Sequence, residues 1–291
     1  MTKILITGAK GQLGTDLYNL SSKYSNWEFT FIDIAELDIT NTNDTFEFLG
    51  KHHFDFLINC AAYTAVDDAE NNKESAFAVN SLAVKNLVEG IRKVKTRLIH
   101  ISTDYVFNGN ETQPYSEEFP TDPQTVYGLS KREGEKAVFE YERGMVIRTA
   151  WLYSGHGHNF VKSIIKKGAE VDELKVVDDQ IGSPTYSKHL AEAILKIIDL
   201  DVSKQTLFIP GIYHFTNSGF CSWYDFALEI IKESNLACLV KPIKSSEYPL
   251  PAKRPAYSVL SLEKIKSLYN LEIPDWKVGL SECLEELRVS T

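Results

Sequence analysis

The first half of the chain alternates short apolar runs with longer segments in which apolar residues recur at helical spacing. The short runs are rich in β-branched residues and end in polar residues or glycine, which predicts strands near residues 3–7, 29–33, 54–59, 97–101 and 145–150. Helical spacing follows after Gly11, and again over residues 77–91 and 127–141. This alternation predicts an α/β fold, with a Rossmann-type doubly wound parallel sheet and right-handed crossovers.

The pattern loosens after Trp151. Helices are predicted from about 159, over 187–198 and from 222 to 234, with two more near the C-terminus, and short strands near 175–177 and 213–215. We therefore predict a dinucleotide-binding domain over residues 1–150. A smaller C-terminal portion, residues 151–291, is expected to be mainly substrate-binding, interleaved with the first domain and returning in part to its sheet.

Composition restricts the class of protein. The 291 residues are 43% hydrophobic and 24% charged, as in ordinary globular proteins. No apolar run approaches the 18 or so residues that span a bilayer, and the N-terminus reads as a strand rather than a signal peptide, so a cytoplasmic protein with no membrane partner is expected. A net charge of −9 argues against nucleic acid as a partner. The four cysteines are dispersed and are expected to be reduced thiols.

A glycine-rich turn follows the first predicted strand. Gly8, Gly11 and Gly14 form G-x-x-G-x-x-G, a variant of the dinucleotide fingerprint. Gly8 permits a tight turn, Gly11 allows the backbone to approach a pyrophosphate, and Gly14 lets the helix pack closely on the sheet. The free N–H groups of the following helix attract phosphate. This stretch therefore predicts a dinucleotide site, which includes Gln12 and Leu13.

Two charged residues bear on the choice between NADH and NADPH. Asp33 follows the second predicted strand, 19 residues after Gly14, close to the position of a carboxylate that binds the adenosine ribose and repels a 2′-phosphate. Asp33 could equally be a helix cap or a solvated loop acid. Lys10 could instead attract the 2′-phosphate, so both cofactors stay open. After the third strand, the small residues Ala61 and Ala62 leave room for the cofactor beside the strand end.

The stretch from Ser102 to Lys131 carries the candidate chemistry. Thr103 ends a buried strand, where open α/β sheets bind ligands. Tyr127 and Lys131 lie four residues apart on a predicted helix, so they face the same way, about 6 Å apart along its axis. An ammonium beside a phenol is expected to lower the tyrosine pKa and make Tyr127 an acid or base near neutral pH. Such pairs also arise by chance on amphipathic helices, but with the glycine turn they predict hydride transfer to a carbonyl.

Clusters of possible metal ligands are interpreted without a metal. Asp67, Asp68 and Glu70 suit the acidic first turn of a helix better than a metal site. His156 and His158 form a close histidine pair in a glycine-containing loop, and no third ligand is evident nearby.

Four further motifs extend the pattern along almost the whole chain. They are residues 59–67 (NCAAYTAVD), 102–107 (STDYVF), 179–185 (DQIGSPT) and Arg254-Pro255. With these motifs the sequence resembles the extended short-chain dehydrogenases/reductases and, within them, the dTDP-4-dehydrorhamnose reductases. The resemblance implies that NADPH or NADH reduces C4 of dTDP-6-deoxy-L-lyxo-4-hexulose, a dTDP-linked 4-keto-6-deoxy sugar, to dTDP-L-rhamnose.

The resemblance also assigns roles. The implied catalytic set is Thr103, Tyr127 as proton donor, and Lys131, which lowers its pKa and holds the nicotinamide ribose. The cofactor-binding candidates are Gly8, Gly11, Gln12, Leu13, Gly14, Asp33, Asp38, Ile39, Ala61, Ala62, Tyr63, Tyr127 and Lys131. The candidates for the sugar pocket are Asp104, Tyr105 and Trp151, and those for the sugar or nucleotide end are Asn159, Gln180 and Arg254. Arg254 could grip a diphosphate bidentately or be a surface charge.

Three questions stay open from sequence. Some members of this family are implied to dimerise through magnesium. Asp16 suits one ligand but no second acid is evident around residues 187–189, so magnesium is doubtful and the chain is a monomer or homodimer. An epimerase or dehydratase that retains NAD is one alternative function, although Asp104-Tyr105 lacks the acid pair typical of dehydratases. A regulatory subunit without turnover, as in methionine adenosyltransferase, is the other.

Overall fold

A six-stranded parallel sheet forms the centre of the larger part of the molecule. The computed structural model describes residues 1–289, so residues 290 and 291 of the predicted second portion lie outside the described residues. The strands stand in the order β10-β5-β4-β3-β1-β2, all parallel, which confirms the predicted doubly wound sheet. Their bounds are β1 Thr2–Thr7, β2 Trp27–Ile32, β3 Phe56–Asn59, β4 Arg97–Thr103, β5 Gly144–Thr149 and β10 Gly211–His214.

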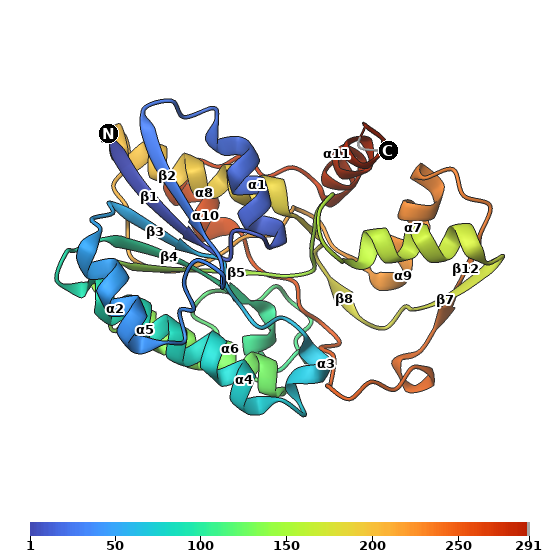
Figure 1. Ribbon diagram of the computed structural model, residues 1–291. Coiled ribbons are helices and arrows are strands. Elements are labelled where there is room, and N and C mark those ends of the chain that lie inside the picture. The colour runs from blue at the N-terminus through green and yellow to red at the C-terminus, as the bar shows by residue number, and fades with distance from the viewer. Residues whose placement is uncertain (290–291) are drawn as a thin grey trace.

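Helices cover both faces of this sheet (Figure 1). One face packs against α1 (Gln12–Ser21), α8 (Ser187–Val202) and α10 (Glu263–Tyr269) in an apolar cluster that includes Leu17, Ile194 and Tyr269. The other face packs against α2 (Thr42–Lys51), α5 (Ala83–Arg92) and α6 (Val126–Phe139). Both faces of the sheet are covered by apolar clusters, which explains why the central strands are apolar on both sides.

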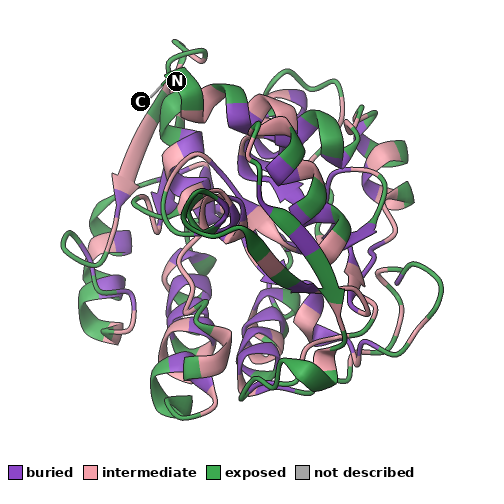
Figure 2. Ribbon diagram, turned by 90° about the vertical axis from the view of Figure 1, so that its right-hand side faces the viewer, coloured by how far each residue is buried: buried purple, intermediate pink, exposed green. Residues whose placement is uncertain are grey.

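A smaller lobe lies beside the carboxyl ends of the strands. It contains three helices, α7 (Phe160–Glu170), α9 (Trp223–Glu233) and α11 (Trp276–Val289), which share one apolar cluster. Its short strands pair two by two: β7 (Glu173–Val177) with β12 (Leu239–Ile243), β6 (Leu152–Tyr153) with β9 (Thr185–Tyr186), and β8 (Ile181–Gly182) with β11 (Cys221–Ser222). Between these elements the chain returns to the sheet as α8, β10 and α10. Figure 2 shows the buried faces of the helices turned inward, with exposed residues outside.

Local signals explain the helix ends. Ser222 begins α9 with a capping box, in which its side chain accepts from the Asp225 N–H and the Asp225 carboxylate accepts in return. The side chain of Asn159 caps α7 and that of Thr125 caps α6. Near the predicted helix over 77–91, the structure has three pieces: α4 (Lys73–Phe77), a π-helical turn (Ala78–Leu82) and α5. No described helix is long and apolar enough to cross a membrane.

Candidate active site

The glycine turn and the switch in strand order place a cavity at the carboxyl edge of the sheet. The chain runs from β1 outward to β2 and then back to β3 on the other side of β1, so a crevice opens between β1 and β3. Gly8 ends β1 with φ of 68°, and a Cβ there would lie 2.6 Å from the Ala61 nitrogen. Helix α1 then begins at Gln12, and its N-cap residue, Gly11, has no side chain to cap it, which leaves the first N–H groups of the helix free to face an anion.

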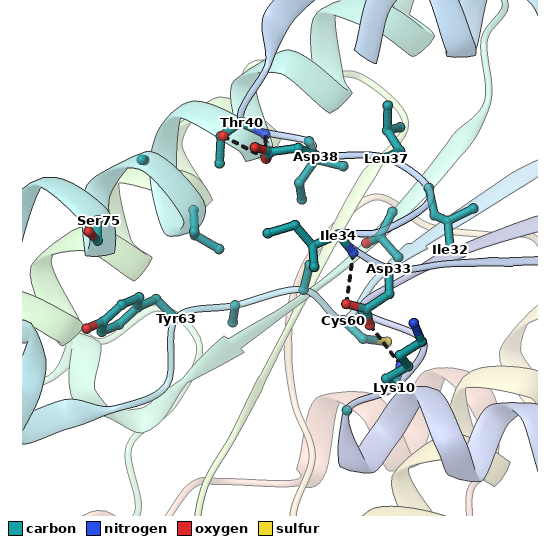
Figure 3. A pocket seen from close by; sticks show the side chains of 18 residues that line it. Lys10, Ile32, Asp33, Ile34, Leu37, Asp38, Thr40, Cys60, Tyr63 and Ser75 are labelled. Atoms are coloured by element: carbon teal, nitrogen blue, oxygen red, sulfur yellow. Dashed lines mark hydrogen bonds between the residues drawn. The ribbon is translucent and has the colours of Figure 1, made fainter. Parts of the chain in front are cut away.

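The first cavity, of about 650 Å³, extends from this turn along β2 (Figure 3). Asp33 lies in it, and its carboxylate accepts from the Lys10 N–H at 2.9 Å and from the Ile34 N–H at 2.8 Å. Asp33 therefore holds the glycine turn against the end of β2 and does not cap a helix. The predicted cofactor residues that line this cavity are Gly8, Gly11, Asp33, Asp38, Ile39, Ala61, Ala62 and Tyr63.

A second cavity, of about 520 Å³, adjoins the first at Gly8, Gly11 and Ala62 and holds the candidate catalytic set. Thr103 comes from the end of β4, while Tyr127 and Lys131 come from the first turns of α6. The other predicted site residues in its lining are Gln12, Leu13, Gly14, Asp104, Tyr105, Trp151 and Asn159. Asn159, a candidate for the sugar or nucleotide end, donates from its amide to Gln12 Oε1 at 2.9 Å, beside the glycine turn.

The expected lowering of the Tyr127 pKa is wrong for this state of the protein. Burial raises the pKa of Tyr127 to about 12, and a hydrogen bond with Thr103 opposes that rise only in part. The ammonium of Lys131 is turned to the Ile101 carbonyl oxygen, 2.6 Å away, and burial lowers the pKa of Lys131 to about 8. Helical spacing predicted the shared face correctly, but it could not give the desolvation of both groups.

Thr103 and its neighbours form a tight polar group. The Thr103 hydroxyl donates to Asp104 Oδ1 at 2.9 Å and accepts from the Tyr105 N–H at 3.2 Å. Burial raises the pKa of Asp104 to about 6. The Tyr105 ring meets the Tyr127 ring edge-on at 5.5 Å. The group thus offers hydroxyls and one readily protonated carboxyl in a low-dielectric setting, which suits proton transfer to a carbonyl oxygen.

A third cavity, of about 280 Å³, lies in the smaller lobe and shares Tyr105 with the second. Gln180 and Arg254 are in its lining rather than in that of the second cavity. Its charged lining residues within the described chain are Lys167, Lys175 and Arg254. Arg254 is not a surface charge, because its guanidinium pairs with Asp67 at 2.5 Å and its side chain is 19% exposed.

The acidic group after β3 does not form a common site. Asp67 and Asp68 lie in the first turn of α3 (Val66–Ala69), as expected. Asp67 binds Arg254, Asp68 accepts from the Tyr63 hydroxyl, and Glu70 accepts from the Val126 N–H at the start of α6. Each carboxylate therefore has its own partner.

The family model for the RmlD substrate binding domain matches residues 1–289. The chain belongs to the RmlD substrate binding domain family. Among similar proteins, the spore coat polysaccharide biosynthesis protein SpsK of Bacillus subtilis is 40% identical over 287 residues, covering 98% of both chains. The dTDP-4-dehydrorhamnose reductase of Escherichia coli is 35% identical over 297 residues, covering 99% of both. The resemblance seen in the sequence motifs is thereby confirmed.

Solved structures agree with this family assignment. A dTDP-4-dehydrorhamnose reductase from Clostridium acetobutylicum superimposes with a TM-score of 0.92 at 42% identity, covering 99% of this chain and 100% of that one. The enzyme of that name from Bacillus anthracis, in complex with NADP, gives a TM-score of 0.91 at 36% identity, covering 98% and 100%. A UDP-glucuronic acid 4-epimerase from Bacillus cereus, at 19% identity, shares the fold.

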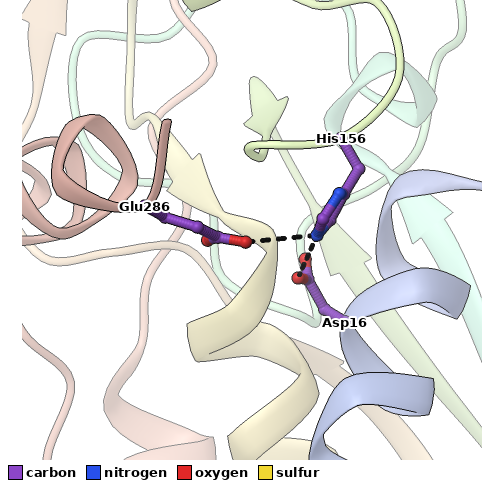
Figure 4. Close-up of side chains that lie close together, drawn as sticks. All are labelled: Asp16, His156 and Glu286. Carbon is purple, nitrogen blue, oxygen red and sulfur yellow. Dashed lines mark ion pairs between the residues drawn. The ribbon is translucent and has the colours of Figure 1, made fainter. Parts of the chain in front are cut away.

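The structure of this RmlD-type chain also brings together a side-chain cluster that was not expected from the sequence. His156 lies between Asp16 of α1 and Glu286 of α11, with Nε2 3.8 Å from Asp16 Oδ1 and 3.2 Å from Glu286 Oε1 (Figure 4). These three are a group of possible metal ligands within residues 1–289. The sequence showed no third ligand beside His156 and His158 and no second acid around residues 187–189; the two acids near His156 come instead from α1 and α11. Glu286 is distant in sequence, and only the packing of α11 brings it close.

Two further residues of the site were missed. Trp223 stacks on Trp151, with ring centroids 3.5 Å apart and planes at 8°, and thereby joins α9 to the end of β5. Trp151 has φ of 49°, uncommon for a bulky residue. Asn80, in the π-helical turn, bonds the backbone of Tyr63 on both sides and donates to Ser130 Oγ of α6. A π-turn carries no sequence signal, but such turns recur at functional sites.

Proposed function

We propose that this protein reduces the 4-keto group of dTDP-6-deoxy-L-lyxo-4-hexulose with NADPH or NADH and gives dTDP-L-rhamnose. One observation carries the proposal: Thr103, Tyr127 and Lys131 line a cavity that is continuous with a dinucleotide-type glycine turn. The names of the similar proteins from Escherichia coli and Bacillus anthracis support it. We place this reaction in the cytoplasm.

The residues present suit a dinucleotide. The uncapped start of α1 offers free N–H groups to a pyrophosphate, and the cavity beyond it runs between small residues, Ala61 and Ala62, and the strand-end acid Asp33. Asp33, Asp38 and Ile39 would surround the adenosine end, and Tyr127 and Lys131 the nicotinamide end. When bound, NADPH or NADH supplies the hydride that adds to C4 of the sugar.

Tyr127 is the proton donor in this proposal. Its pKa of about 12 keeps the phenol protonated at neutral pH, which an acid needs before it gives its proton to the sugar O4. As C4 gains the hydride, the carbonyl electron pair moves to O4 and bonds to this proton, so the ketone becomes an alcohol. Lys131 and Thr103 then stabilise the phenolate until solvent reprotonates it.

The third cavity suits the nucleotide end of the substrate. Its charged lining residues within the described chain are cations, and a diphosphate is an anion that guanidinium and ammonium groups bind. Phe160, Trp223 and Tyr248 add aromatic surface for a base. Tyr105 belongs to both cavities, so a sugar nucleotide that spans them would place its sugar beside Tyr127.

The test follows NADPH oxidation with enzymatically generated dTDP-4-keto-6-deoxy-L-sugar. Tyr127→Phe removes the proton donor and is expected to lower kcat by at least about 100-fold, within the range for acid–base catalysis. Tyr141→Phe is the matched control, because it removes a phenol hydroxyl that bonds the Thr96 carbonyl, away from the cavity. It should keep native kcat.

Loss of turnover in both variants would assign the effect to folding, and unchanged turnover in Tyr127→Phe would remove Tyr127 from the mechanism. If the native protein binds NADPH yet oxidises none with this sugar, the substrate assignment fails. A similar protein from Streptomyces antibioticus, 36% identical, is named a probable 4-ketoreductase for another dTDP-sugar. That sugar is therefore the second substrate to assay.

A further inference from the structure

Helix α6 carries three buried functional side chains in one row. Tyr127, Lys131 and Glu135 follow each other at intervals of four residues, so they lie on one face of the helix. Glu135 is fully buried and does not line the second cavity, unlike Tyr127 and Lys131. A buried carboxylate this close to a reaction centre needs a physical explanation, because isolated buried charge is strongly unfavourable.

The hydrogen bonds of Glu135 come from two neighbouring strands, and Arg132 on the same helix adds an ion pair, with Nη1 3.8 Å from Glu135 Oε2. Its Oε1 accepts from Ser102 Oγ of β4 at 2.7 Å and from Arg148 Nε of β5 at 2.8 Å. Its Oε2 accepts from Arg148 Nη2 at 2.8 Å, which completes a bidentate pair. Ser102 and Arg148 face each other in the β4–β5 register. A single carboxylate therefore joins α6 to both strands at one level of the sheet.

This junction sets where the helix lies along the strands. Ser102 directly precedes Thr103, so the contact with Glu135 is fixed one residue away from the candidate hydroxyl. A slip of α6 along β4 would break the bonds of Glu135 to Ser102 and Arg148 together and move Tyr127 relative to Thr103. Because the pair is buried, such a slip would also leave uncompensated charges.

Glu135 also acts on the charge of Lys131. Burial disfavours the ammonium, and among the nearby groups Glu135 is the main one that favours it. Lys131 is faced by other titratable or charged groups from each neighbouring element. These are Tyr127 and Glu135 on α6, Cys60 after β3, His100 on β4 and Asp104 after β4. Arg132 of α6 and Arg148 of β5 act on Lys131 through Glu135, with which both are paired. Glu135 is thus the carboxylate, one helical turn away, that offsets the burial of this cation.

We propose that Glu135 is a positioning residue for the reduction: it locks α6 to β4 and β5 through Ser102 and Arg148, and it holds Lys131 as a cation in the cavity of Tyr127. This inference rests on the proposed function. It assigns to Glu135 no contact with substrate or cofactor, and its effect is exerted through Lys131 and through the register of α6.

Glu135→Gln tests the charge. The amide keeps the shape of the side chain but removes the negative charge, so Lys131 should lose its proton at lower pH. We expect the alkaline limb of the pH profile of kcat/KM to move toward acid by about one unit, with an activity loss of about 5-fold at pH 8. Glu133→Gln is the matched control, because Glu133 lies on the same helix in an exposed pair with Lys136. Its profile should match that of the native protein.

A merely structural role would lower activity equally at all pH values and leave the limb in place. A folded Glu135→Gln variant with a native limb would therefore overturn the proposal. If Glu135→Gln does not fold, Glu135→Asp tests whether Glu135 positions α6 against both strands. It retains the charge but is too short to reach both strands, so kcat should fall by about 5-fold or more with KM for NADPH unchanged. Native kcat in Glu135→Asp would contradict the inference.

A second readout separates failure of this inference from failure of the proposed function. The 13Cε chemical shift of Lys131, assigned with Lys131→Met, reports its protonation without any turnover. We expect its titration to move toward acid in Glu135→Gln and not in Glu133→Gln. If the native protein shows no reductase activity but the Lys131 titration still moves toward acid in Glu135→Gln, the proposed function fails while the link between Glu135 and Lys131 stands. If the Lys131 titration stays in place in Glu135→Gln, the link between Glu135 and Lys131 is rejected.

Discussion

Two side-chain groups each contain a buried carboxylate, Glu135 in one and Asp16 in the other, and the charges of the two groups are balanced in different ways. Beneath α6, one carboxylate, Glu135, meets the Arg148 guanidinium in a bidentate pair, with a serine hydroxyl as third donor and the Arg132 guanidinium 3.8 Å away. Beside the glycine turn, two carboxylates, Asp16 and Glu286, converge on the single imidazole of His156. Asp16 is 2% exposed, and its Oδ2 has no hydrogen-bond partner within the described residues.

The difference shows how the fold accommodates buried charge. Where the partner is a permanent cation with matching geometry, the carboxylate can stay ionised at any ordinary pH. Where two acids share one imidazole, desolvation prevails, and it raises the pKa of Asp16 to about 6. The first group is therefore a fixed anchor for α6, whereas the second changes its charge near neutral pH.

The largest effect should come from breaking the balanced pair. Arg148→Met removes both short N–H donors of the buried Glu135 carboxylate and leaves it the Ser102 hydroxyl and the longer pair with Arg132, so we expect a loss of about 3 kcal/mol in the free energy of unfolding. Urea denaturation measures this loss. Arg92→Met removes an exposed arginine that pairs with Glu89, and it should cost about 1 kcal/mol or less. Equal losses in the two variants would contradict the distinction drawn here.

Removing the charge of Asp16, in the group of Asp16, His156 and Glu286, should instead raise the free energy of unfolding. Between pH 3.8 and about 6 the folded protein binds more protons at Asp16 than the unfolded chain does, so stability falls as pH rises. Above pH 6 the ionised carboxylate costs up to about 3 kcal/mol. Asp16→Asn should therefore gain up to that amount at pH 8 and almost nothing at pH 4, measured by urea denaturation in EDTA. Asp44→Asn is the control, because Asp44 is an exposed acid in the first turn of α2, and this variant should gain no stability at pH 8. If the gain in stability of Asp16→Asn does not depend on pH, titration of Asp16 is not its cause.

The smallest effect concerns how Glu286 is held. The Tyr186 hydroxyl donates to Glu286 Oε2 at 2.5 Å. The ring of Tyr153 stacks on the ring of Tyr186, with centroids 5.8 Å apart, but the Tyr153 hydroxyl has no hydrogen-bond partner within the described residues. Tyr186→Phe should lower the free energy of unfolding by about 2 kcal/mol, as for a hydrogen bond to a charged group. Tyr153→Phe removes the same atom from the same stack and should be neutral or stabilising. Equal losses would show that the hydroxyl to Glu286 contributes nothing specific.

Local spacing accounts for what the sequence predicted well. The glycine turn, the strand-end position of Thr103 and the shared face of Tyr127 and Lys131 all follow from periods within a few residues. The doubly wound sheet follows from their alternation.

What sequence could not predict depends on packing between distant segments. Glu286 reaches Asp16, and Trp223 reaches Trp151, because helices of the smaller lobe fold back on the sheet edge. The predicted direction of the Tyr127 pKa shift was wrong for a related reason. The direction of the Lys131 amine and the depth of burial are tertiary properties, and together they outweigh the helical spacing of the two side chains.

The stack of Trp151 on Trp223 gives the protein an optical signal of its own. The chain has four tryptophans, and two of them lie face to face at 3.5 Å, one at the end of β5 and the other at the start of α9. Indoles this close couple their electronic transitions, so they produce a paired band in circular dichroism that isolated indoles lack. Because Trp151 follows a strand of the sheet and Trp223 begins a helix of the smaller lobe, that band reports whether α9 is seated against the end of β5, without any label.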